Sequence, residues 1–306
     1  MSAVELIGVT KTFGEVTAVD DLSLTVPAGS VFGFIGPNGS GKTTTIRMIV
    51  NIFYPDRGSV SVFGAPMTGD RTELIGYLPE ERGLYRKMAV RPLLEFFGQL
   101  RGGKNVAKEV GYWLERLDLA HCADRKVETL SKGMSQRVQF IAAIVPEPRL
   151  LILDEPFTGL DPVSADGLRA AILDLRRNGA TVILSTHDMS VAETLCDQIF
   201  MIFRGRKVLD GTLAEIQQQY GADTIRVSVE GGAAAIGYLP GVERVHDLGQ
   251  VQELRVTRGC DPHEVLRTLV MRARVSSFAV TRPSLHDIFV RIAGPAAEEQ
   301  EAAAHA

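Results

Sequence analysis

The sequence predicts an α/β fold: a mostly parallel sheet with antiparallel N-terminal strands, an inserted helical subdomain and a small α+β C-terminal domain. Apolar runs of strand length alternate with helical stretches before and after residues 81–145, which is typical of a parallel sheet. Residues 81–145 instead carry apolar positions at helical spacing, and short strand signals return beyond residue 220. We therefore expect one domain over 1–220, with its helical subdomain at about 81–145, and an accessory domain over 221–293. Residues 294–306, rich in Ala and Glu without periodicity, are expected to be disordered.

The composition is that of an ordinary globular protein. Of the 306 residues, 45% are hydrophobic and 23% are charged, which suits about two domains. No apolar run approaches the roughly 18 residues that span a bilayer, and Met1–Glu5 lacks the features of a signal peptide, so we expect a cytoplasmic protein. The three cysteines show no metal-binding spacing. The net charge of −4 argues against nucleic acid as a partner.

The N-terminal stretch, residues 3–35, alternates apolar and polar positions between turn-forming residues, which predicts short antiparallel strands. Phe13 lies in a loop within this stretch. It is either a core aromatic residue or a side chain that stacks on an adenine base, and the sequence leaves both interpretations open.

A glycine-rich loop joins the apolar run Val31–Ile35 to a polar helix start, and its spacing fits G-x-x-x-x-G-K-[ST]. The glycines let successive backbone N–H groups curl around a phosphate, and the helix directs the positive end of its dipole at the same oxygens. Lys42 is expected to reach the outer phosphates, and Thr43 to offer a hydroxyl to Mg²⁺. These features predict a P-loop NTPase core that binds a nucleoside triphosphate. The expected binding residues are Gly36, Pro37, Asn38, Gly39, Ser40, Gly41, Lys42, Thr43 and Thr44.

Two further buried-strand runs end in polar residues. Leu150–Leu153 is followed by Asp154 and Glu155, and Thr181–Ser185 is followed two positions later by His187. Parallel strands bind ligands at their carboxyl ends, so these residues are expected near the P-loop. Asp154 would hold Mg²⁺, directly or through water, and Glu155 would accept a proton from the attacking water. Taken alone, the acidic pair could simply end a strand, and His187 would be an ordinary turn histidine.

The order of motifs resembles that of the ATP-binding-cassette ATPases, the nucleotide-binding subunits of ABC transporters. The resemblance covers about residues 4–220 and depends on the family order of the motifs. These motifs are Walker A at Gly36–Thr43, the signature at Leu130–Met134, Walker B at Leu150–Glu155, the D-loop at Gly159–Asp161 and the switch histidine at His187.

The resemblance implies ATP and Mg²⁺ as ligands, hydrolysis with Glu155 and His187 at the reacting phosphate, and a separate membrane permease to which the chain docks at the cytoplasmic face. It also implies a head-to-tail dimer, in which each ATP lies between one P-loop and the signature of a second copy. The signature and D-loop residues expected to contact ATP are Ser131, Lys132, Gly133 and Asp161. A helix starting near Ser135, just behind the signature, would form an anion site, although the same pattern by itself also fits an ordinary turn and helix cap.

Three features depart from the usual family pattern. The signature has Lys132 and Met134 in place of a glycine and a glutamine, and Glu80 stands where a glutamine usually senses Mg²⁺. A carboxylate at position 80 would be a further Mg²⁺ ligand but lacks the amide donor. Together with the C-terminal domain, these features resemble the sodium-efflux and drug-export branch, which implies an exporter.

The expected permease-docking surface is the groove around Glu80–Val90, where Leu84, Tyr85 and Met88 offer apolar contacts, unless these residues only pack the subdomain. A soluble cassette ATPase acting on DNA or ribosomes is the alternative, which the short insert and single cassette disfavour. A regulatory ATP-binding module is a further alternative that the unusual signature leaves open.

The C-terminal domain carries strand runs at Thr224–Glu230 and Leu254–Thr257. Asp261 begins a capping box with proline at the first helical position, and Ser284 is expected to cap the last helix. The sequence shows no catalytic set of residues in this domain, so we expect it to serve in dimer contact or regulation.

Overall fold

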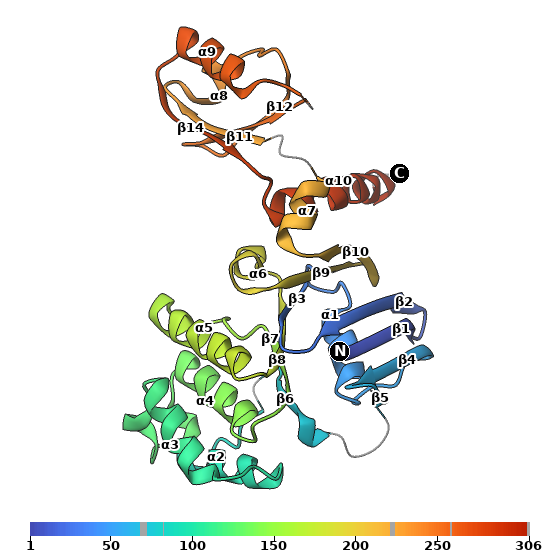
Figure 1. The fold of residues 1–306 in the computed structure, drawn as a ribbon, viewed down its shortest axis with the longest axis vertical. Helices are drawn as coiled ribbons and strands as arrows, with labels where there is room; N and C mark the ends of the chain where they lie inside the picture. Colours follow the sequence, from blue (N-terminus) through green and yellow to red (C-terminus); the bar gives the residue numbers. More distant parts are fainter. Residues whose placement is uncertain (68–71, 82, 221–223, 258, 305–306) are drawn as a thin grey trace. The chain divides into compact units, whose positions relative to one another are not determined.

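The computed structural model describes residues 1–67, 72–81, 83–220, 224–257 and 259–304. The chain forms two compact units, Met1–Thr212 and Leu213–Ala306 (Figure 1). The division falls shortly before the boundary at residue 220 that the sequence predicts.

The first unit is built around a six-stranded sheet with strand order β10-β9-β3-β8-β7-β6. Strands β9, β3, β8, β7 and β6 are parallel, and β10 is antiparallel to β9. This arrangement confirms the α/β fold with a mostly parallel sheet. The strands are β3 (Val31–Ile35), β6 (Ile75–Leu78), β7 (Leu150–Asp154), β8 (Thr181–Thr186), β9 (Gln198–Phe203) and β10 (Arg206–Gly211).

A second, antiparallel sheet has the order β2-β1-β4-β5. Its strands are β1 (Ser2–Phe13), β2 (Val16–Pro27), β4 (Arg57–Val62) and β5 (Ala65–Pro66). The prediction of short N-terminal strands was wrong in length, because β1 and β2 each have 12 residues. Register shifts between Leu6 and Val9, and again before Lys11, interrupt the alternation of apolar side chains, so the sequence pattern of one long strand suggests two short ones.

Alternate residues of each central strand enter different cores. In β7, Leu150 and Ile152 pack with the antiparallel sheet and α1 (Lys42–Ile49), whereas Leu151 and Leu153 pack with the helices on the opposite face. Those helices include α4 (Lys132–Ile144) and α5 (Pro162–Arg177) (Figure 1). The sheet is therefore covered on both faces, as its continuous apolar runs require.

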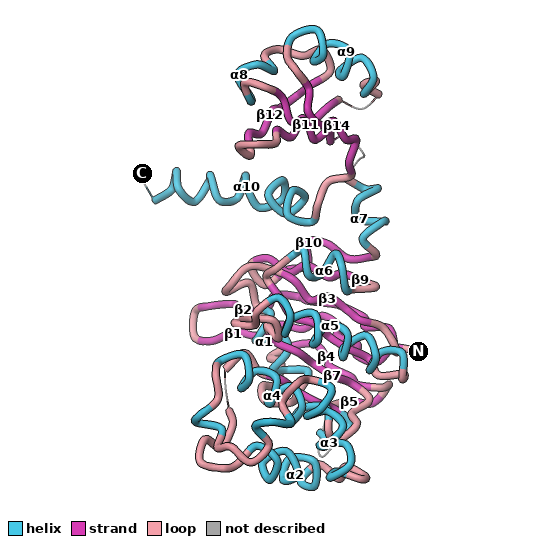
Figure 2. The backbone as a smooth tube through the Cα atoms, turned by 90° about the vertical axis from the view of Figure 1, so that its left-hand side faces the viewer, coloured by secondary structure: helices cyan, strands magenta, loops and turns pink. Residues whose placement is uncertain are grey.

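The inserted helical subdomain consists of α2 (Val90–Leu100) and α3 (Val106–Arg116), which pack together and against α4, as Figure 2 also shows. Trp113 of α3 meets the ring of Phe140 of α4 edge to face at 6.4 Å. Val110, Leu114 and Leu94 are fully buried between these helices, because their spacing places them on one helical face. A short helix, α6 (Met189–Leu195), follows β8.

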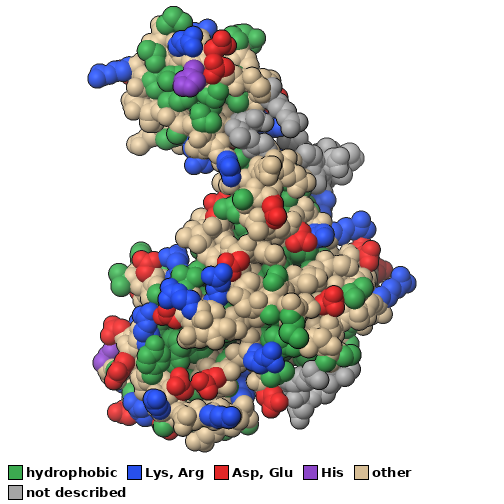
Figure 3. Space-filling model, viewed as in Figure 1, with side chains coloured by type: hydrophobic (Ala, Val, Ile, Leu, Met, Phe, Trp, Pro, Cys, Tyr) green, Lys and Arg blue, Asp and Glu red, His purple; other side chains and the backbone are tan. Residues whose placement is uncertain are grey.

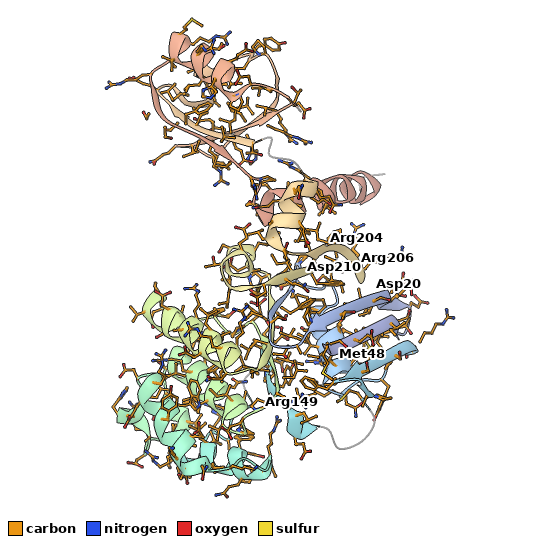
Figure 4. All side chains as sticks on the ribbon, in the orientation of Figure 1. Asp20, Met48, Arg149, Arg204, Arg206 and Asp210 are labelled. Atoms are coloured by element: carbon orange, nitrogen blue, oxygen red, sulfur yellow. The ribbon has the colours of Figure 1, made fainter. Side chains whose placement is uncertain are left out.

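Strand β10 was not predicted, and it follows directly on a turn that separates it from β9. The turn is confined to Arg204 and Gly205, and β10 begins at Arg206. Arg206 Nη2 lies 2.6 Å from the Asp20 carboxylate of β2, and the two residues lie near each other in Figure 4. The basic residues thus belong to an edge strand that is tied to the antiparallel sheet.

The second unit contains an antiparallel sheet with the order β12-β13-β11-β14. From β11 to β14 its elements follow the order βαββαβ, which with this strand order is the ferredoxin-like arrangement. The elements of the unit are α7 (Leu213–Gln219), β11 (Thr224–Val229), α8 (Gly232–Ile236), β12 (Val242–Asp247), β13 (Gln252–Val256), α9 (Pro262–Arg272), β14 (Val275–Thr281) and α10 (Leu285–Ala304).

One face of this sheet forms an apolar core with α8 and α9, in which Ile225, Leu254, Ile236 and Leu269 are buried. Strands β12 and β14 were not predicted. Most of their residues are at least partly exposed, so they lack the alternation of buried positions that marks a half-buried strand.

The predicted helix caps are confirmed. The Asp261 carboxylate accepts a hydrogen bond from His263 N at 2.9 Å. Ser284 N donates to Asp287 Oδ2 at 2.8 Å, while Ser284 Oγ accepts from Asp287 N at 3.2 Å, so the two residues form a reciprocal cap. Helix α10 continues to Ala304, and the side chains from residue 295 onward lie outside the description, so disorder of 294–306 stays a prediction.

Charged side chains of both signs are interspersed over the face of the first unit shown in Figure 3. Within the described part of the chain, the helices are too short or too polar for any of them to traverse a lipid bilayer.

Candidate nucleotide site

Two glycines allow the P-loop to fold tightly after β3. A Cβ atom on Gly36 would lie 2.3 Å from the carbonyl oxygen of Ile202, and one on Gly41 would lie 2.6 Å from that of Ala18. Gly41 also has φ of +108°, a conformation that other residues rarely adopt. The backbone therefore approaches its neighbours more closely than any side chain would permit.

Lys42 lies inside the loop that it follows. Its Nζ atom donates hydrogen bonds to the carbonyl oxygens of Gly36 at 2.7 Å and Pro37 at 3.1 Å. Burial lowers the pKa of Lys42, and the carboxylates of Glu155 and Asp154 oppose that shift. A phosphate placed in the loop would give this buried ammonium group a stronger partner than two carbonyl oxygens.

A cavity of about 220 Å³ opens beside the loop. Six of the nine expected P-loop residues line it with the two strand-end acids and Glu80, whereas Gly36, Pro37 and Ser40 do not. Ala18 of β2 is a lining residue that the sequence did not suggest. The lining residues are Ala18, Asn38, Gly39, Gly41, Lys42, Thr43, Thr44, Glu80, Asp154 and Glu155. Within the loop itself, Ser40 Oγ is buried without a hydrogen-bond partner among the described residues. The loop thus has donors to spare for an anion.

Asp154 ends β7 directly opposite the P-loop helix. Its carboxylate accepts hydrogen bonds from Ser185 Oγ at 2.7 Å and Thr43 Oγ1 at 3.3 Å, and Asp154 is only 1% exposed. Burial raises the pKa of Asp154, the bond from Ser185 opposes this rise, and the charges of Glu80 and Glu155 add to it. The hydroxyl of Thr43 beside a buried carboxylate is a set of hard oxygen donors that suits Mg²⁺.

Glu155 and His187 are brought together by adjacent strands. The His187 backbone N–H donates to Glu155 Oε1 at 2.9 Å, and His187 Nδ1 lies 2.6 Å from the same oxygen. Thr186 Oγ1 donates to Glu155 Oε2 at 3.3 Å. The Glu155 side chain is 9% exposed and that of His187 is 55% exposed. The carboxylate is therefore fixed at the cavity while the imidazole reaches the surface.

Two glutamines of α4, which the sequence analysis missed, hold the segments that carry the predicted acids. Gln139 Nε2 donates to the carbonyl oxygens of Pro79 at 3.3 Å and Glu81 at 3.2 Å, on either side of Glu80. Gln136 Nε2 donates to the carbonyl oxygen of Pro156 at 3.3 Å, next to Glu155. Both glutamines are almost fully buried. Their spacing of three positions, which places both amides on one helical face, was the available signal.

Several predicted residues do not line this cavity. The loop predicted at Phe13 was wrong, because Phe13 is the last residue of β1. It is 45% exposed and meets the ring of Phe53 edge to face at 5.3 Å, so the core interpretation of Phe13 was also wrong, whereas stacking on adenine stays a prediction. Asp161 caps α5 by accepting hydrogen bonds from Ser164 N at 3.0 Å and Ser164 Oγ at 2.6 Å, and its hydrogen bonds with Ser164 lower its pKa.

The signature residues also lie outside the cavity. Ser131 Oγ accepts a hydrogen bond from Met134 N at 3.2 Å, and α4 starts at Lys132, three positions earlier than the helix start expected near Ser135. Ser131 and Lys132 are exposed, and Gly133 is half-buried. The cap interpretation is therefore confirmed, and contact of these residues with a nucleotide stays a prediction.

A larger cavity of about 550 Å³ lies elsewhere in the first unit, with Tyr112, Trp113 and Asn178 among its lining residues. It shares no residue with the cavity at the P-loop. Because it contains none of the phosphate-binding loop or the strand-end acids, its size does not make it the nucleotide site.

Comparisons with known proteins agree with this site. Residues 19–158 match the family model for ABC transporter, and residues 211–293 match that for the C-terminal domain of DrrA1-3-like ATP-binding proteins. The ABC transporter ATP-binding protein YhaQ of Bacillus subtilis is 38% identical over 94% of this chain and 97% of its own length. The daunorubicin resistance ATP-binding protein DrrA3 of Streptomyces coeruleorubidus is 32% identical over 99% of both chains.

A solved structure of an ATP-binding subunit of an ABC transporter is 29% identical, with a TM-score of 0.69, and the match covers 72% of this chain and 94% of that one. The fold and the site together define a P-loop ATPase of the ATP-binding-cassette type. The chain belongs to the family of ABC transporter ATP-binding proteins, in the branch with a DrrA-like C-terminal domain. It binds and hydrolyses ATP as a transporter subunit, and the alternative of a non-transport cassette ATPase is not favoured.

Proposed function

We propose that the P-loop cavity binds ATP together with Mg²⁺ and that the chain thereby powers export through a separate permease. The observation that carries this proposal is that Lys42, Thr43, Asp154 and Glu155 surround one cavity at the carboxyl ends of β3 and β7. Lys42 would bind the outer phosphate oxygens, while Thr43, Asp154 and Glu80 would hold the metal. When bound, Mg²⁺ would neutralise phosphate charge and orient the transferred group.

Glu155 is the residue placed to activate water. Its carboxylate is held by three hydrogen-bonding groups of Thr186 and His187, so its position is fixed before a substrate arrives. As the water oxygen attacks the γ-phosphorus, Glu155 takes the proton and the bond to ADP breaks. His187, with an exposed imidazole, would contact the γ-phosphate.

A second copy of the chain would complete the site. Ser131, Lys132 and Gly133 form the start of α4, where a hydroxyl and free backbone N–H groups can bind an anion, yet they do not line the P-loop cavity of their own chain. A head-to-tail dimer would use both phosphate sites on each chain at once, with Asp161 at the interface.

Mixed dimers can test this arrangement. If one protomer carries Ser131→Ala and the other Lys42→Ala, a head-to-tail dimer retains one site with both an intact P-loop and an intact signature. Placing both substitutions on one protomer and none on the other leaves no intact site. We therefore expect clearly higher ATPase activity from the first combination. The reverse ranking would show that each chain uses its own signature, and would overturn the proposal.

The permease would dock beside Glu80. Leu84 and Met88 pack against the subdomain core, so for these two residues the packing interpretation holds. Tyr85, by contrast, is 55% exposed and Phe96 is 41% exposed, and their rings meet edge to face at 6.0 Å. An exposed aromatic pair of this kind is the usual anchor of a protein interface.

Docking at this pair would place the chain at the cytoplasmic face of a membrane. Relatives named for Nod factor export in Rhizobium and linearmycin resistance in Bacillus subtilis favour outward transport. Tyr85→Ala combined with Phe96→Ala is expected to abolish copurification with the permease subunit while the free subunit still hydrolyses ATP. Unchanged copurification would show that the permease docks at another surface.

A further inference from the structure

The face of the second unit's sheet that points away from α8 and α9 carries an unusual set of charges. Strand positions alternate, so with Ile225 and Leu254 in the core, Arg226, Glu253 and Arg255 belong to the opposite face. Arg244 of β12 pairs directly with Arg255 of β13 in the sheet register. Like charges at directly opposed positions destabilise a sheet, so this pair costs stability in the free protein.

A cavity of about 130 Å³ lies over these arginines, and residues of α10 complete it. We call it the basic pocket; its residues include Arg244, Glu253, Arg255, Asp287, Val290 and Arg291. It belongs entirely to the second unit and shares no residue with the nucleotide site.

Within the described residues of the second unit, the ion pairs leave the basic pocket with uncompensated positive charge. Both of its carboxylates already face Arg226, whose Nε lies 3.2 Å from Glu253 and whose Nη2 lies 3.8 Å from Asp287. Arg255 is paired outside the pocket, with the Glu243 carboxylate 3.2 Å from its Nε atom.

Among the residues that the structure describes, no carboxylate pairs with either of the other two arginines. Arg291 donates to two neutral acceptors, the carbonyl oxygen of Tyr220 at 3.3 Å and Thr224 Oγ1 at 3.4 Å. Arg244 has no ion pair or hydrogen bond to any part of the second unit that the structure describes. A guanidinium group binds a carboxylate or phosphate through two parallel hydrogen bonds, and both arginines remain available for such a bond.

We propose that the basic pocket binds a small organic anion, a carboxylate with a short apolar body. The anion would relieve the repulsion between Arg244 and Arg255, and its apolar part would lie against Val290 and the arginine methylene groups. A cavity of about 150 Å³ accommodates benzene, so the body has roughly six non-hydrogen atoms or fewer. This site is independent of ATP hydrolysis.

The test uses the full-length protein and four probes, namely butyrate, benzoate, inorganic phosphate and the uncharged analogue benzamide, with binding measured by calorimetry and saturation-transfer NMR. We expect butyrate or benzoate to bind more tightly than phosphate, and benzamide to show no binding. Arg244→Gln should lower the affinity for the carboxylate about 10- to 100-fold, since a hydrogen bond to a charged group is lost.

The matched control is Arg274→Gln, because Arg274 is an exposed arginine of the same unit that does not line the pocket. Binding should also survive Lys42→Ala, which removes the competing anion site in the P-loop. Thermal unfolding checks that Arg244→Gln is folded. No carboxylate binding, phosphate binding more tightly than either carboxylate, or equal affinity in Arg244→Gln and wild type would each overturn the proposal.

Discussion

Replacing Glu155 by glutamine separates nucleotide binding from hydrolysis. The amide has the shape of the carboxylate, so its oxygen can still accept the hydrogen bond that His187 N donates to Oε1 at 2.9 Å. Its nitrogen would then face Thr186 Oγ1, which can accept as readily as donate. Only the charge is lost, and we expect the fold and the affinity for ATP to be retained.

The catalytic cost follows from the role of the carboxylate. Removing a positioned general base slows the chemical step by about 10²- to 10⁴-fold. The assay is phosphate release at saturating ATP, with ATP affinity measured separately by calorimetry. Glu115→Gln, at an exposed position of α3, provides a control for the substitution itself. A Glu155→Gln protein that turns over at the wild-type rate, or one that no longer binds ATP, would refute the assignment of Glu155 as the base.

Three further substitutions test other parts of the first unit. Because burial raises the pKa of Asp154, its charge costs stability above that pKa. Asp154→Asn should therefore raise the melting temperature in EDTA near pH 8, with no gain in acid, and should abolish stabilisation by Mg²⁺ with ATP. The hydrogen bond from Lys11 lowers the pKa of Asp56 to about 2. The stability that Asp56 contributes should therefore be complete near neutral pH and lost as the pH falls from about 4 toward 2. Acid unfolding of the wild type and of Asp56→Asn measures this difference. Gly36→Ala should lower the free energy of unfolding in urea by about 2–3 kcal/mol and prevent ATP binding, because the added Cβ would lie 2.3 Å from a carbonyl oxygen. The control Gly167→Ala, where the added Cβ would meet open space, should be neutral or stabilising.

The parts of the site that the sequence predicts are those fixed by local geometry. The spacing from Gly36 to Thr43 requires a tight loop before a helix, and the ends of parallel strands must meet at one edge of the sheet, which brings Asp154 to Thr43. Glu155 and His187 follow adjacent strands for the same reason.

The unpredicted parts depend on contacts between distant segments. Strand β10 is held by its pairing with β9 and by Asp20, which no local pattern reveals. In the sequence, Gln139 is one polar residue of a helix, and its contact with the segment around Glu80 appears only in the folded structure. Strands β12 and β14 could not be predicted for a different reason: they bury too few side chains to show the two-residue alternation of a strand.

Helix α4 connects the features that the motifs describe separately. The signature residue Ser131 caps its N-terminus, Gly133 lies in its first turn, and its 13 residues extend about 20 Å. Along that length, Gln136 and Gln139 hold the backbone beside Glu155 and beside Glu80. In the proposed dimer, any displacement of the signature by a nucleotide held on a second copy would therefore be transmitted by one rigid element to Glu155. The same element would move the segment that leads to the exposed aromatic pair, so in the proposed complex a single helix would report the nucleotide state to the permease.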